Sequence, residues 1–119
     1  MKRLLALLLL LPLPATAQQT HADLQCTPAG KDLIYDCVIR LRRGGQPLSG
    51  VQLTVGADMP SMPMAHSTKP VKARRGSSPG EYLARLDLEM RGEWAVKLRI
   101  AGPSSDPFRD LVVKKMRFD

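Results

Sequence analysis

Apolar and polar side chains alternate with a period of two along most of the chain that follows residue 32. Each alternating stretch is short, and glycine, proline or serine residues separate it from the next. This pattern is typical of strands that bury one face in an antiparallel sheet and expose the other face to water. The clearest stretches are 33–42, 51–55, 82–88, 94–100 and 111–118. We therefore predict an all-β fold, an antiparallel β-sandwich of about seven strands.

Two local features add detail to this sandwich. The short connection at Arg91 and Gly92 predicts that the segments 82–88 and 94–100 pair with each other as a hairpin. Trp94 presents a large apolar side chain within an alternating segment. We therefore expect it to anchor the core between the two sheets.

The N-terminal segment differs from the rest of the chain. Two basic residues precede an apolar run at 4–13, and an Ala-x-Ala signal ends at Ala17. These are the three parts of a cleavable secretory signal. The run is too short for a membrane anchor, which needs about 20 apolar residues. We therefore expect removal of residues 1–17, which leaves a single β-sandwich domain at 18–119 in the periplasm with no membrane span.

The chain carries a formal net charge of +7, and aromatic residues make up only 4% of it. The basic side chains are spread over the predicted strands and loops. Proteins that bind nucleic acid use aromatic platforms on which bases stack, so we expect no nucleic-acid partner. A solvated surface is our first interpretation, and weak attraction to anionic membranes or acidic partners is the second. Val71 and Ala73 lie among these basic residues and predict a short edge strand. The neighbouring positive charges would discourage this strand from pairing with the edge of another molecule.

Cys26 and Cys37 are the two cysteines of the chain. Turn-forming residues at 27–32 separate them, so a hairpin would place the two side chains opposite each other. An oxidising compartment favours a disulfide. Its short loop would stabilise the fold by about 2–3 kcal/mol. A thiolate metal pair is the alternative, although the spacing is not Cys-x-x-Cys.

Methionine is concentrated at 59–66, a stretch that reads Met-x-x-Met-x-Met-x-His. Thioether sulfur is a soft, neutral ligand that suits Cu(I) and needs no deprotonation. In an extended segment Met62, Met64 and His66 would point to one side, because side chains alternate along a strand. Met59 would join them through a turn that follows it. We predict a copper site, with Cu(I) preferred, whose ligands are Met62, Met64 and His66, and Met59 as a fourth.

Other interpretations of these residues stay open. The methionines fit flexible apolar filler at the end of the sandwich, and they also fit an adaptable docking surface for a protein partner. His21 follows the predicted cleavage point, so we expect an exposed histidine in a frayed terminus. Met90 is expected to pack at the rim of the core. Whether His21 or Met90 joins the copper site depends on the directions of the strands.

The methionine stretch and its surroundings resemble the YtkA-like/FixH-like family of small exported or membrane-tethered β-sandwich domains. The residues that carry the resemblance are 51–55, 59–66, 79–88 and 90–96. The resemblance implies an immunoglobulin-like sandwich and an association with copper handling, including copper supply to haem-copper oxidases. It also implies the ligand set Met59, Met62, Met64 and His66.

No catalytic signature is present in the sequence: it contains no Gly-x-Ser-x-Gly, no His-Glu-x-x-His, no P-loop and no dinucleotide-binding glycine pattern. We therefore expect a non-enzymatic, exported Cu(I)-binding protein, a copper chaperone or tolerance factor that exchanges the ion with a membrane protein. The alternative is an interaction or assembly module that binds no metal and docks on an exported or membrane complex through the same loop.

Overall fold

The computed structural model describes residues 19–62, 64–103 and 108–119. The predicted signal peptide at 1–17 lies outside these described residues. No helix among them is long and apolar enough to cross a membrane. They form strands β1 (Thr20–Pro28), β2 (Ile34–Arg43), β3 (Gln46–Pro47), β4 (Gln52–Asp58), β5 (Val71–Lys72), β6 (Arg74–Arg75), β7 (Glu81–Asp87), β8 (Gly92–Ala101) and β9 (Arg109–Phe118).

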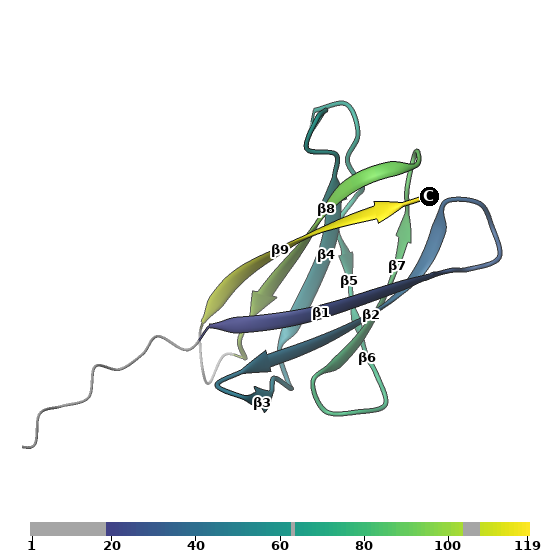
Figure 1. Cartoon of the computed structure of the whole chain (residues 1–119). Coiled ribbons are helices and arrows are strands. Elements are labelled where there is room, and N and C mark those ends of the chain that lie inside the picture. Colours follow the sequence, from purple (N-terminus) through teal and green to yellow (C-terminus); the bar gives the residue numbers. More distant parts are fainter. Residues whose placement is uncertain (1–18, 63, 104–107) are drawn as a thin grey trace, which may run out of the picture.

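The strands build two antiparallel sheets that face each other (Figure 1). The first sheet has the order β1-β2-β7-β6, with β3 paired to β2, and the second has the order β5-β4-β8-β9. Strands β1 and β9 contact each other along one side of the sandwich, and β5 lies near β7 on the other. The predicted all-β, immunoglobulin-like sandwich is confirmed.

The core lies between the sheets and follows the alternation in the sequence. Each long central strand buries every second side chain, and Trp94, Leu98 and Ile39 are among the fully buried ones. The indole Nε1 of Trp94 donates a hydrogen bond to the Met90 carbonyl at 3.0 Å, so its polar atom is satisfied. Trp94 is therefore the core anchor that its sequence context predicts.

The connection between β7 and β8 differs from the prediction. The two strands are not a hairpin, because β7 belongs to the first sheet and β8 to the second. Leu88 is buried between them, and its amide donates to the Leu33 carbonyl at 2.9 Å. Alternation specifies which face of a strand is apolar and does not specify the neighbouring strand. The hairpin prediction was wrong for this reason.

Strand β1 was not expected from the hydrophobic pattern. Its inward positions include Thr20 and Ala22, which are buried but too small or too polar to give a strong apolar signal. His21 is exposed as expected, but it pairs with Arg42 within a regular strand and not in a frayed terminus.

The predicted short edge strand near Val71 is present and divides between the two sheets. Strand β5 pairs with β4, and β6 pairs with β7. Ala73 lies between them, and its amide donates to the Leu53 carbonyl at 2.8 Å. One short segment therefore forms an edge of both sheets.

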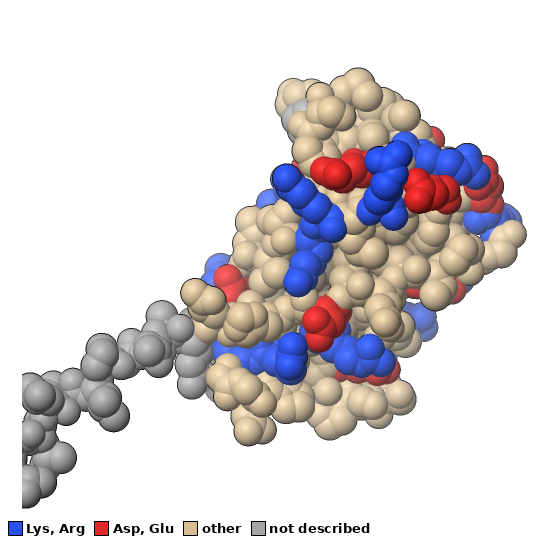
Figure 2. Space-filling view, in the orientation of Figure 1, with Lys and Arg blue, Asp and Glu red and all other residues tan. Residues whose placement is uncertain are grey.

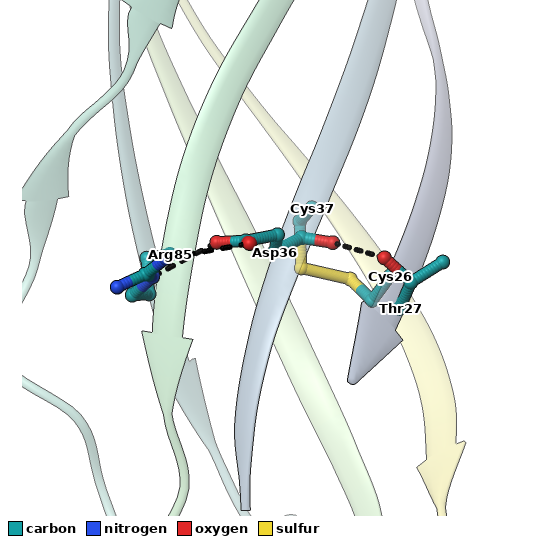
Figure 3. A network of polar contacts seen from close by, with 5 residues as sticks. All are labelled: Cys26, Thr27, Asp36, Cys37 and Arg85. Atoms are coloured by element: carbon teal, nitrogen blue, oxygen red, sulfur yellow. Dashed lines mark hydrogen bonds and ion pairs between the residues drawn. A yellow bond between two sulfur atoms is a disulfide. The ribbon is translucent and has the colours of Figure 1, made fainter. Parts of the chain in front are cut away.

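The predicted disulfide is present. Cys26 and Cys37 are direct partners in the β1–β2 hairpin, and their sulfur atoms are bonded (Figure 3). Asp36, next to Cys37, accepts a hydrogen bond from Arg85 Nε at 2.8 Å. This guanidinium holds the pKa of Asp36 below its ordinary value. The disulfide and the ion pair link β1, β2 and β7 across the first sheet.

Candidate functional site

The methionine loop (residues 59–66) projects from the end of β4 at the top of Figure 1. Its base is closed by backbone pairing, because the Met59 amide donates to the His66 carbonyl at 3.1 Å. An isolated bridge between Asp58 and Ser67 continues this pairing. Directly before the loop, Asp58 forms an ion pair with Lys97, with 2.6 Å between Oδ2 and Nζ. The loop therefore begins and ends at a fixed position on the second sheet.

Within the loop the backbone forms turns and is not extended. The Met62 amide donates to the Met59 carbonyl at 3.0 Å, and the His66 amide donates to the Met62 carbonyl at 3.1 Å. The turn that Met59 would need is thus present. The premise that Met62, Met64 and His66 alternate along an extended segment is not met, because turns replace the period of two. Pro63 lies outside the described residues.

The three methionines of the loop occupy different environments. Met59 is only 6% exposed and belongs to the core, whereas Met62 is 43% exposed and Met64 is 97% exposed. The Met59 Cε lies 3.1 Å from the point where a Cβ on Gly92 would stand. Met59 therefore packs beneath the loop against the start of β8, whereas Met62 and Met64 lie on the exposed surface.

His66 makes the polar contact that orients the loop. Its Nδ1 lies 2.8 Å from Glu89 Oε2, and its side chain is 28% exposed. This contact leaves Nε2 as the ring nitrogen that a metal ion would take. Metal-binding histidines commonly use their other nitrogen in this way to contact a carboxylate, which fixes the ring orientation. Glu89 is thus a site residue that sequence reasoning missed, because it lies 23 residues from His66 in the chain.

Strand directions settle where the two remaining sequence candidates lie. Met90 follows Glu89 in the connection between β7 and β8 and is 36% exposed, so it lies at the same end of the sandwich as the methionine loop. His21 lies at the start of β1, opposite Arg42 at the end of β2. This is the other end of the sandwich (Figure 1). His21 is therefore remote from the loop.

The donor atoms at the loop have a definite chemical character. Among the described residues, no group of three or more His, Cys, Asp and Glu side chains is placed to hold a metal ion. Both cysteines are in the disulfide. The donors that the loop itself offers are the exposed thioethers of Met62 and Met64 and the imidazole of His66, a set of two soft ligands and one borderline ligand.

Comparison with known proteins agrees with the family resemblance in the sequence. No curated protein and no solved structure matches the chain. The model of the family described as YtkA-like matches residues 15–99. This range covers the strands β1 to β7, most of β8 and the whole methionine loop. The chain therefore belongs to the YtkA-like family.

Proposed function

We propose that this protein is an exported, non-enzymatic copper carrier that binds Cu(I) through Met62, Met64 and His66. The observation that carries the proposal is the composition of the loop, which holds two exposed methionines and a histidine whose Nδ1 lies 2.8 Å from Glu89 Oε2. Thioethers favour soft Cu(I) over harder divalent ions. Three such ligands suit a site of low coordination number.

Export strengthens this choice of ligands. In an oxidising compartment the two cysteines are held in a disulfide, so they do not act as thiolate ligands. Methionine remains available because its sulfur carries no proton to lose. The protein therefore offers Cu(I) a site that does not depend on thiol reduction.

Met59 acts beside this site and not in it. Its burial against Gly92 fixes the base of the loop. Recruiting its sulfur would remove an apolar side chain from the core, which costs stability. We therefore propose Met62, Met64 and His66 as the ligands, with Met59 as the support beneath them.

The exposure of the loop suits transfer of the ion. Met64 lies almost entirely in solvent, so a partner's ligand can approach and replace it while His66 still holds the ion. Such stepwise exchange fits a chaperone or tolerance factor that passes copper to, or accepts it from, a membrane protein.

A competition titration tests this function. The disulfide-bonded protein without residues 1–17 is titrated with Cu(I) against a coloured chelator. The double variant Met62→Leu and Met64→Leu keeps the side-chain volume. It is expected to lose at least about 100-fold in Cu(I) affinity, because it removes two ligands, whereas mutation of a residue that only contacts a ligand typically costs about 10–100-fold. The matched control is Met116→Leu in β9, which removes a thioether outside the loop. Equal affinities of the double variant and the control would reject the site.

A second candidate function rests on the same exposure. A flexible, exposed pair of methionines is also typical of adaptable protein-binding surfaces. Thermal unfolding with and without Cu(I) separates the two functions. A hundredfold excess over the dissociation constant stabilises a binding protein by about 2.7 kcal/mol. A docking module that binds no metal shows no such shift in Tm.

A further inference from the structure

The outer faces of the two sheets differ in charge. On the first sheet the strand residues that point outward include four cations and four anions, so this face is neutral: Arg40, Arg42, Arg74, Arg85, Asp23, Asp36, Glu81 and Asp87. Most of them are paired, as Arg40–Glu81, Arg42–Asp23 and Arg85–Asp36. Figure 2 shows blue and red side chains next to one another over β1 and β2.

The outer face of the second sheet is strongly basic. Alternation and register place six cations and two anions there: Lys72, Lys97, Arg99, Arg109, Lys115, Arg117, Asp58 and Glu93. In the described part of the chain, ion pairs on this face engage Lys97 with Asp58 and Arg117 with Asp119, and none engages Lys72, Arg99 or Lys115. The positive charge of the strands is therefore concentrated on one sheet, contrary to the even spread expected from the sequence.

Two exposed aliphatic side chains lie among these cations. Leu111 and Val113 are each 47% exposed. The register of β8 and β9 places Leu111 opposite Arg99 and Val113 opposite Lys97, and direct cross-strand partners project from the same face of a sheet. The basic face thus combines guanidinium and ammonium groups with apolar contact area on its edge strand.

The shape of this face is open. A shallow hollow of about 160 Å³ lies beside Gly56, lined by Thr54, Lys97 and Arg99 among others. Gly56 leaves this space because it has no side chain between β5 and β8. The hollow also contains the Asp58 carboxylate, which pairs with Lys97, and it is too small to be a peptide groove.

We propose that the outer face of the second sheet docks on an anionic phospholipid membrane. Charge complementarity carries this inference, because Lys and Arg side chains at an anionic bilayer each contribute favourably to binding. Leu111 and Val113 contact the boundary between headgroups and acyl chains, as apolar side chains of peripheral proteins do. A spread of cations over three strands without a peptide-sized groove fits a lipid surface better than an acidic protein segment.

Vesicle co-sedimentation in the absence of copper tests the proposal independently of the metal site. The protein is used without residues 1–17, whose apolar run would itself bind lipid; both sheets lie within the described residues that follow. It is expected to bind vesicles of phosphatidylcholine mixed with phosphatidylglycerol and not vesicles of phosphatidylcholine alone. High salt is expected to weaken binding, because it screens exposed charges.

Matched charge variants locate the face. Arg99→Gln with Lys115→Gln is expected to lower partitioning about tenfold or more. Arg40→Gln with Arg85→Gln removes the same charge from the first sheet and is expected to change it little. Equal losses in both variants would show attraction by net charge alone and overturn the proposal. Absence of vesicle binding, or preference for a polyglutamate competitor over vesicles, would overturn it as well.

Discussion

At the scale of single residues, the contact of Glu89 with His66 joins the methionine loop of the second sheet to the connection that crosses from β7 in the first sheet to β8 in the second. In the proposed site the Glu89 carboxylate holds Nδ1 and would leave Nε2 to bind the metal, and carboxylates that contact a metal ligand in this way typically affect metal affinity by about 10–100-fold. Glu89→Ala is therefore expected to weaken Cu(I) binding about tenfold or more in the competition titration, while Met62 and Met64 remain.

The matched control for this change is Glu93→Ala, which removes an exposed carboxylate from the outer face of β8. It alters the net charge equally without touching His66. Unchanged affinity after Glu89→Ala would mean that His66 is not a ligand or needs no orienting partner. An equal loss in both variants would indicate a general electrostatic effect.

Sequence analysis could find the ligand types of the site but not their surroundings. Met62, Met64 and His66 can be recognised from the sequence because soft ligand side chains are concentrated in one short stretch. The burial of Met59 depends on packing against Gly92, and the role of Glu89 depends on how the loops meet. Neither arises from spacing along the chain, so only the folded structure shows them.

At the scale of strands, Tyr82 ties the two sheets together. Its hydroxyl donates to the Leu48 carbonyl at 2.9 Å and accepts from the Val51 amide at 3.4 Å, just before β4. Burial raises the pKa of Tyr82, and the Val51 amide opposes this rise in part. The phenol therefore anchors the crossing from the first sheet to the second in its protonated form.

Tyr82→Phe is expected to lower the free energy of unfolding by about 1–3 kcal/mol, since it leaves the buried Val51 amide and the partly buried Leu48 carbonyl without their partner. Urea denaturation measures this loss through the midpoint at unchanged slope. Tyr35→Phe is the control, because its hydroxyl makes only an exposed 3.5 Å contact to the Asp119 carbonyl. Equal effects of the two substitutions would argue against the anchoring role of Tyr82.

The positions of most strands could be predicted from the sequence, but the pairing between strands could not. Alternation identified β2, β4, β7 and β8 with the buried face of each, and the apolar residues near the C-terminus located β9 without showing that Leu111 and Val113 point outward. It missed β1, whose inward threonine and alanine give little contrast, and it paired β7 with β8 wrongly. Pairing is decided by how buried faces stack in three dimensions, as Leu88 shows by turning inward at the crossing.

At the scale of the whole molecule, the proposed membrane face and the methionine loop are adjacent. Asp58 belongs to the outer face of the second sheet and is the residue at which the loop begins. A molecule lying on a bilayer through this sheet would hold the loop at the rim of the contact. The ion would then be presented laterally at the membrane surface, where a membrane protein could exchange it.

The disulfide offers a test of how stability and metal binding are divided across the molecule. Cys26 and Cys37 are 11 residues apart and join two strands of the first sheet. In the chain-entropy model, a loop of this length contributes about 2–3 kcal/mol. Reduction of the wild-type protein removes the cross-link without changing side-chain volume, and it is expected to lower the free energy of unfolding by this amount in urea.

The double variant Cys26→Ala and Cys37→Ala then separates the two possible copper sites. It is expected to lose at least as much stability as the reduced protein, because Cys37 is buried and its truncation leaves a cavity. Its Cu(I) affinity, measured at a temperature where it is folded, should equal that of the oxidised wild type. Equal affinities are expected if the ligands are Met62, Met64 and His66, because neither protein then uses a thiolate. Weak binding by both of these forms, with tight binding by the reduced wild type alone, would instead assign the ion to a thiolate pair and leave Met62 and Met64 as a docking surface.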